Sequence, residues 1–148
     1  MRIEEALQGV SAILMDSAPA IYHLERNPAY AERMASFFVA RVHNGIVVVT
    51  SPVTLAECLV YPLRRGLTNL EASYYSLIVE GEDTDFHIIG QQEATLAART
   101  RATYDLRLAD AFQVAVAMQA GCQAILTNDP VFKRVPDIRA LVLDELEP

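Results

Sequence analysis

Short apolar segments that alternate with longer segments of helical periodicity constrain the fold of this chain more than any other feature. The clearest is IVVVT at residues 46–50, whose consecutive β-branched side chains favour a strand buried on both faces. Further strands are predicted in SAILMD before Asp16, FHII at 86–89, QAILT at 123–127 and RALVL at 139–143. Helical periodicity and cap-then-proline signals predict helices at about 3–10, 17–25, 28–43, 52 onward, 67–80, 91–103 and 108–120.

Strands that alternate with helices form a parallel sheet covered on both faces. Right-handed crossovers then bring the carboxyl ends of all its strands to one edge. We therefore predict an α/β fold, a three-layer α/β/α arrangement around a mostly parallel sheet of about four to five strands. Residues 1–148 should form one domain, with 1–10 as a short N-terminal helical extension.

The composition predicts a cytoplasmic protein with a hydrophobic core. Hydrophobic residues make up 52% of the chain, and no run of about 18 apolar residues indicates a membrane span. The first residues, MRIEEALQGV, do not resemble a secretory signal, because they carry two acids and no apolar segment. Cys58 and Cys122 belong to no Cys-x-x-Cys pair, so we expect two reduced cysteines that pack as small hydrophobic side chains.

The net charge is negative, since 12 basic minus 19 acidic side chains gives −7. This excludes nucleic-acid binding through bulk charge, because non-specific affinity comes from Lys and Arg side chains on phosphates. Solubility is the ordinary explanation for such a charge. An acidic active site is the alternative, and it requires specific residues.

Three aspartates lie at positions where α/β proteins often place catalytic residues, namely directly after a strand or at the start of a buried helix. Asp16 and Asp129 each follow an apolar strand segment, and Asp110 opens the almost wholly apolar helix DAFQVAVAMQA. Each aspartate also suits the start of a helix, where a carboxylate accepts backbone N–H groups, and Asp129 is followed by a proline. Taken singly, each is weak evidence for a catalytic site, and a helix cap is the better explanation of Asp16 alone.

Glu57 is too deep in its predicted helix to cap it, and its helical neighbours Val60 and Tyr61 are apolar. A carboxylate in such a stripe predicts either a buried ion pair with an arginine or a metal ligand. Two carboxylates about 4 Å apart repel by roughly 4 kcal/mol at an effective dielectric of about 20. A cluster of the four acids therefore predicts a bound cation, and oxygen ligands without histidine suit Mg²⁺ or Mn²⁺.

Other catalytic signatures are absent from the sequence. His23, His43 and His87 lack the spacing of zinc ligands, and no G-x-S-x-G, Walker A or G-x-G-x-x-G motif occurs. A phosphohydrolase with Asp16 as nucleophile is disfavoured, because Ala18 stands where the second aspartate usually does. Carboxylate-bound metal chemistry on a phosphodiester is the remaining prediction.

Four segments resemble those of PIN-domain ribonucleases of the VapC-like kind, the toxins of type II toxin–antitoxin pairs. They are MDSAPAIYHLE, TLAECL, LRLADAFQVAVAMQAG and AILTNDPVFKRV, and the resemblance covers about residues 13–143. The resemblance implies a homodimeric α/β/α protein whose Asp16, Glu57, Asp110 and Asp129 bind one or two Mg²⁺ or Mn²⁺ ions. A further acid often follows the fourth one in the family, and here the next is the more distant Asp137, which leaves the second ion open.

The resemblance also implies roles around the acids. Ser17 and Thr127 match hydroxyl positions that orient carboxylates and metal-bound water, and Asn128 is expected to help, although local capping explains all three nearly as well. Basic residues close in sequence to the acids are predicted to contact RNA phosphates. They are Arg64, Arg65, Arg107, Lys133 and Arg134, with Arg99 and Arg101 as further candidates. Tyr22 and Tyr61 could stack on bases or pack in the core.

The function predicted in this way is endoribonuclease activity, in which metal-activated water cuts single-stranded or loop RNA. A cognate antitoxin encoded nearby is the implied protein partner. The alternatives are a PIN-like module that no longer cuts and serves protein interaction, and a PIN nuclease that is not a toxin. Retention of all four acids argues against the first alternative.

Overall fold

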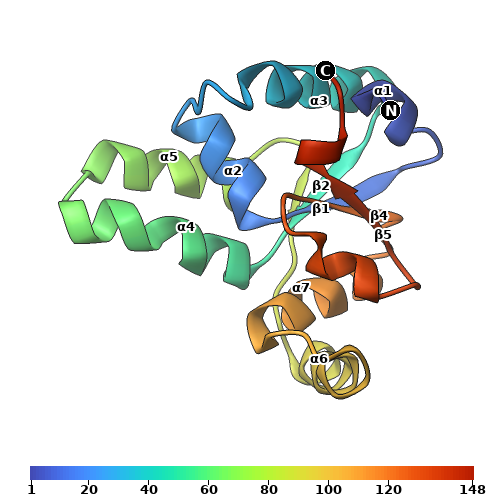
Figure 1. Ribbon diagram of the computed structural model, residues 1–148. Coiled ribbons are helices and arrows are strands. Elements are labelled where there is room, and N and C mark those ends of the chain that lie inside the picture. Colours follow the sequence, from blue (N-terminus) through green and yellow to red (C-terminus); the bar gives the residue numbers. More distant parts are fainter.

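The computed structural model describes residues 1–148 and confirms the predicted α/β fold (Figure 1). Its five-stranded sheet is parallel throughout and has the strand order β3-β2-β1-β4-β5. The strands are β1 (Ala12–Met15), β2 (Val47–Thr50), β3 (Thr84–Phe86), β4 (Ala124–Thr127) and β5 (Arg139–Val142). The first strand is therefore the central one, and its carboxyl end lies in the middle of one edge of the sheet.

Helices connect consecutive strands and cover both faces of the sheet. They are α1 (Ile3–Ala6), α2 (Ser17–Leu24), α3 (Ala31–Asn44), α4 (Pro52–Arg65), α5 (Thr68–Ile78), α6 (Gln91–Tyr104) and α7 (Leu108–Gln119). Two 3₁₀ helices, η1 (Pro130–Arg134) and η2 (Leu143–Glu145), flank β5. None of the helices has the length and apolar character needed to cross a membrane.

Two hydrophobic cores lie on opposite faces of the sheet, because alternate side chains of each strand point in opposite directions. Ile13 and Met15 of β1 pack into the core formed with α1 to α5, whereas Leu14 packs into the core formed with α6 and α7. Figure 1 shows α1 and α3 on one side of the sheet and α6 and α7 on the other. The N-terminal segment is part of the first core, since Ile3 and Val10 are both buried there.

Several element boundaries differ from the predictions, and the first helix, predicted to end near residue 10, ends at Ala6. The strand predicted at 86–89 is wrong: β3 spans Thr84–Phe86, because its register with Val48–Thr50 of β2 fixes it, and Ile88 beyond it is 66% exposed. The helix predicted from residue 28 begins only at Ala31. The Asn27 side chain accepts the Ala29 N–H at 3.0 Å and turns the chain before the helix.

Candidate active site

Asp16 lies at the centre of the carboxyl edge of the sheet, directly after β1. Its carboxylate caps α2 by accepting the Ser17 N–H at 2.9 Å, so the helix-cap interpretation is correct. Two further donors hold the same carboxylate: the Thr127 hydroxyl contacts Oδ2 at 2.8 Å and the Gln113 amide contacts Oδ1 at 3.3 Å. With a residue exposure of only 7%, Asp16 is fixed in one orientation by three donors.

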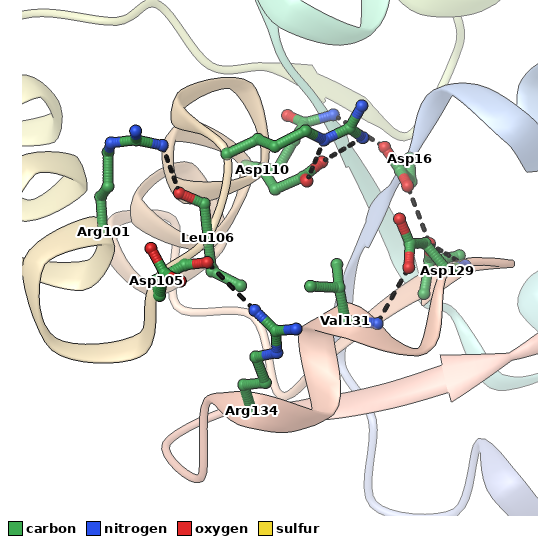
Figure 2. Close-up of polar contacts among 11 residues, drawn as sticks. Asp16, Arg101, Asp105, Leu106, Asp110, Asp129, Val131 and Arg134 are labelled. Carbon is green, nitrogen blue, oxygen red and sulfur yellow. Dashed lines mark hydrogen bonds and ion pairs between the residues drawn. The ribbon is translucent and has the colours of Figure 1, made fainter.

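Asp129 lies beside Asp16 because β4 pairs in parallel with β1. The Thr127 hydroxyl that donates to Asp16 also accepts the Asp129 N–H at 3.0 Å, so one buried oxygen links the two acids. The Asp129 carboxylate caps η1 by accepting the Val131 N–H at 2.9 Å. Figure 2 shows Asp16, Asp110 and Asp129 gathered around one region, with the link between Asp16 and Asp129 dashed.

Asp110 comes from the first turn of α7 and is 6% exposed. It makes no helix-cap hydrogen bond of the kind expected. Instead its carboxylate pairs with Arg107, with Nε to Oδ2 at 3.0 Å and Nη2 to Oδ1 at 3.5 Å. An open hollow of about 530 Å³ is lined by these two residues together with Asp105, Asp129, Pro130, Val131 and Arg134.

Glu57 is solvent-exposed, which corrects the prediction of a carboxylate within a buried apolar stripe. Its neighbours Val60 and Tyr61 are 44% and 47% exposed, because this side of α4 faces solvent. No basic side chain forms an ion pair with Glu57. Its carboxylate nevertheless lies within the electrostatic influence of Asp16 and Asp110.

Burial and neighbouring negative charge raise the pKa of two of the acids, Asp16 and Glu57. Burial is the main cause that raises the pKa of Asp16, and the charge of Asp110 adds to it, while hydrogen bonds from Thr127, Ser17 and Gln113 oppose it. Partial desolvation and the charge of Asp16 raise the pKa of Glu57. The site is therefore a concentration of negative charge that a cation would stabilise.

The sequence interpretation missed a buried polar network beneath Asp16. The Gln113 amide nitrogen donates to Thr54 Oγ1 at 2.8 Å as well as to Asp16, and its oxygen accepts the Ser51 hydroxyl at 2.6 Å. Thr54 in turn donates to the Met15 carbonyl at 3.1 Å. A buried amide is stable only when its groups are paired, so the single glutamine in the apolar part of α7 was the available signal.

Ser17 and Asn128, the other two residues expected to support the acids, have different surroundings. Ser17 contributes its N–H to Asp16, and its hydroxyl interaction lowers the pKa of Glu57. Asn128 points elsewhere: its amide donates to the Tyr22 and Tyr30 hydroxyls at 3.2 and 2.9 Å. These two tyrosines stack on each other with ring centroids 3.9 Å apart.

Of the basic residues proposed for RNA binding, two line the hollow beside the acids and three do not. Arg107 and Arg134 line the hollow beside Asp110 and Asp129. Lys133 pairs with Glu145, with Nζ to Oε2 at 2.5 Å. Arg64 and Arg65 end α4 at the tip of the α4–α5 pair, which Figure 1 shows extending away from the sheet.

Two other arginines lie farther from the acids. Arg101 donates to the Leu106 carbonyl at 2.6 Å and thereby holds the loop before α7. Arg99 lies on α6, beside Gln119 at the far end of α7. Asp137 precedes β5 and therefore lies at the opposite edge of the sheet from Asp16.

The donor set fits a hard divalent cation in its chemistry, since all four groups offer carboxylate oxygens. No group of three or more His, Cys, Asp or Glu side chains is arranged to hold a metal ion in this structure. Three of the acids have partners within the protein: three donors engage Asp16, a guanidinium engages Asp110, and a backbone N–H engages Asp129. A cation held by the four acids would have to compete with Arg107 for Asp110.

Fold and site together define a parallel α/β/α protein with an acidic centre at the carboxyl edge of its sheet. The family model described as PIN domain matches residues 13–138, and the chain therefore belongs to the PIN domain family. This confirms the family resemblance seen in the sequence. No curated protein sequence matches this chain.

Solved structures with the same fold include proteins of toxin–antitoxin systems. VapBC2 from Rickettsia felis, bound to a DNA fragment from its promoter, has a TM-score of 0.68 at 12% identity over 88% of this chain and 98% of that chain. A toxin–antitoxin complex from Klebsiella pneumoniae has a TM-score of 0.66 at 19% identity over 88% and 97%. Mycobacterium tuberculosis VapC20, a Sarcin-Ricin loop cleaving toxin, has a TM-score of 0.64 at 16% identity over 76% and 86%. At these identities the likeness shows a shared fold.

Proposed function

We propose that this chain is a Mg²⁺- or Mn²⁺-dependent endoribonuclease and the cytoplasmic toxin of a toxin–antitoxin pair. The observation that carries the proposal is Asp16, a buried carboxylate with a raised pKa that three donors hold beside Asp110. Such a group is costly for stability and typical of a site that carries out chemistry. Its position at the carboxyl edge of a parallel sheet in a PIN domain supports the same conclusion.

The relatives of similar fold support RNA as the substrate and an antitoxin as the partner. VapC20 is a Sarcin-Ricin loop cleaving toxin, and VapBC from Salmonella typhimurium and FitAcB from Neisseria gonorrhoeae also share the fold. An antitoxin could block the site with a basic side chain, because the acids attract a cation of any kind. We also propose a homodimer, with a second copy of the chain as the other protein partner.

Four residues would hold the ion: Asp16, Glu57, Asp110 and Asp129. A divalent ion bound there would supply Lewis acidity toward the phosphodiester and lower the pKa of bound water. The chain itself fixes the geometry, since Thr127 orients Asp16 and the backbone of Asp129 through one hydroxyl. The buried Gln113 amide restrains the other oxygen of Asp16. The proposed site holds one or two ions.

Basic side chains at the hollow would bind and orient the RNA backbone. Arg107 and Arg134 are placed to contact phosphates next to Asp110 and Asp129. Lys133 lies on the same 3₁₀ helix as Arg134, and Glu145 must release it before it can bind a phosphate. Arg64 and Arg65 could contact RNA only where it extends along α4.

Cleavage of a single-stranded RNA by the purified protein tests the proposal. The wild type should cut with Mg²⁺ or Mn²⁺ and not with EDTA, and added ion should restore cleavage. Asp16→Asn and Asp110→Asn should each lower the rate by more than about 100-fold, because even groups that only support a metal ligand contribute about 10- to 100-fold. Asp137→Asn is the matched control: it removes one exposed carboxylate at the opposite edge of the sheet and should cut normally.

Calorimetry with Mn²⁺ separates the nuclease from a PIN-like interaction module. Acid-dependent Mn²⁺ binding together with cleavage supports the proposal. Cleavage by the two Asn variants at the wild-type rate would overturn the assignment. Absence of both cleavage and Mn²⁺ binding in the wild type would instead identify an interaction module.

Growth arrest tests the toxin part of the proposal. Induced expression should stop growth, and coexpression of a small protein from the adjacent reading frame should restore it. Light scattering of the purified chain tests the homodimer.

A further inference from the structure

Arg107 has an unusual combination of exposure and partner. Its side chain is 76% exposed, yet it forms a two-contact ion pair with Asp110, whose side chain is only 9% exposed. Its guanidinium therefore lies in solvent at the mouth of the acidic centre and reaches inward to a buried carboxylate. Asp129 and Glu57 also act on this guanidinium, so it experiences three of the four acids.

Helix stability does not explain an arginine at this position. Arg107 is the N-cap residue of α7, yet its side chain makes no cap hydrogen bond. Ser, Thr, Asp and Asn are the residues that satisfy the free N–H groups there. The positive end of the helix dipole also disfavours a guanidinium at a helix N-terminus. An ion pair with an exposed partner contributes little to folding.

We propose that Arg107 is an exchangeable counter-ion of the acidic centre, which holds Asp110 until a divalent cation binds and then binds an RNA phosphate. The inference rests on the proposed function and assigns Arg107 a step in it. In the cation-free protein the guanidinium neutralises Asp110. A divalent cation held by the acids would neutralise Asp110 in place of Arg107, and the guanidinium would then be free at the entrance of the hollow.

Arginine suits such an exchange for two reasons. A guanidinium does not lose its proton, so Asp110 keeps a positively charged neighbour at every ordinary pH until another cation competes for it. Its planar fork matches a phosphate as well as it matches a carboxylate. Because the side chain is mostly in solvent, turning outward breaks no packing contact in the core. The hollow shared by Arg107, Asp110 and Asp129 places the released group next to the acids.

The exchange predicts reciprocal coupling between cation and phosphate binding. If Arg107 competes with the cation for Asp110, its removal must tighten cation binding. If the cation releases Arg107, the cation must increase the part of RNA affinity that depends on this residue. Both effects belong to one equilibrium, so they are linked by thermodynamics.

Calorimetric titration with Mn²⁺ in the absence of RNA tests the first half. Arg107→Ala should bind Mn²⁺ about two- to five-fold more tightly than the wild type, the ratio that corresponds to one exposed ion pair. Arg134→Ala is the matched control, because Arg134 lines the same hollow but donates to the Asp105 carbonyl at 3.0 Å and pairs with no acid. Arg134→Ala measures the general effect of losing one positive charge, and its increase in Mn²⁺ affinity should be clearly smaller than that of Arg107→Ala.

Binding of a fluorescent single-stranded RNA, with Ca²⁺ or with EDTA, tests the second half, and a gel verifies that the RNA stays intact. Arg107→Ala should weaken RNA binding several-fold with Ca²⁺ and little with EDTA. Arg134→Ala should weaken binding to the same extent in both buffers. Thermal unfolding of each variant establishes that it is folded.

The outcomes are distinct from those of the proposed function. Equal Mn²⁺ affinity in Arg107→Ala and Arg134→Ala, or equal loss of RNA binding by Arg107→Ala in both buffers, would overturn the exchange while metal-dependent cleavage stands. A wild type that binds no Mn²⁺ would overturn the exchange, and if it also failed to cut RNA the nuclease would be overturned as well.

Discussion

The Thr127 hydroxyl offers the sharpest test of how the acidic centre is built. It is fully buried, donates to Asp16 Oδ2 at 2.8 Å and accepts the Asp129 N–H at 3.0 Å. Thr127→Val replaces the hydroxyl by a methyl group of nearly the same shape and preserves the β-branched side chain that β4 favours. The substitution therefore removes two hydrogen bonds and little else.

The expected cost follows from these two bonds. A hydrogen bond to an ionised carboxylate contributes about 1.5–3 kcal/mol, and a neutral one about 1 kcal/mol. The free energy of unfolding at pH 7 should therefore fall by about 2–4 kcal/mol in Thr127→Val. The loss should shrink in acid, because the bond to Asp16 is strongest when that carboxylate is ionised.

The sign of the pH dependence can be worked out. The Thr127 hydrogen bond lowers the pKa of Asp16 against the larger effect of burial, so its removal raises that pKa further. The variant then binds the Asp16 proton more tightly than the folded wild type does. The difference in stability between the two proteins must decrease as the pH falls through both folded-state pKa values.

Urea denaturation at pH 7 and at pH 3 measures the effect. Thr100→Val is the matched control, since Thr100 is also buried but its hydroxyl donates only to the Leu96 carbonyl, within α6 and away from the acids. It should cost less than about 1 kcal/mol at either pH, as a bond back to the helix carbonyl contributes little. Equal losses in the two variants, or a Thr127→Val loss that is the same at both pH values, would refute the reasoning.

Two further predictions concern the groups around Thr127. Burial and the charge of Asp110 raise the pKa of Asp16 in the folded protein, so the wild type loses stability as the pH rises from the unfolded-state pKa through the folded-state pKa. Asp16→Asn should therefore be more stable than the wild type at pH 7 but not at pH 3. A variant that is less stable than the wild type at pH 7 would contradict this. Gln113→Leu removes the partner of the buried Ser51 hydroxyl and should cost about 2–4 kcal/mol in denaturation experiments, whereas Gln119→Leu on the exposed side of α7 should cost less than about 0.5 kcal/mol.

The arrangement of strands and helices could be predicted because each central strand is buried on both faces. Such strands appear as continuous apolar runs, and β1, β2 and β4 were all predicted from these runs. The edge strand β3 has the sequence TDF and pairs with β2 alone, so hydrophobicity gives no signal for it. Its position depends on backbone register.

The parts of the site that could be predicted are those that follow from the parallel strands, whose carboxyl ends lie at one edge of the sheet. Asp16 and Asp129 follow neighbouring parallel strands, and Asp110 opens a buried helix, as expected. The role of Gln113 was not predicted, because it depends on a hydrogen bond to Asp16, which lies 97 residues earlier in the sequence. The exposure of Glu57 was missed because periodicity identifies an apolar stripe but not whether another element covers it.

The central position of β1 has a consequence for how the protein acquires its active site. β1 is made first, but its partner β4 follows more than a hundred residues later, and the contact between Thr127 and Asp16 spans 111 residues. Contacts of such long range form slowly, since a large loop must close before they stabilise the chain. A chain still emerging from the ribosome already contains Asp16, Glu57 and Asp110, yet it lacks β4, whose Thr127 hydroxyl orients Asp16. The Thr127 contact that orients Asp16 is therefore among the last parts of the acidic centre to be assembled.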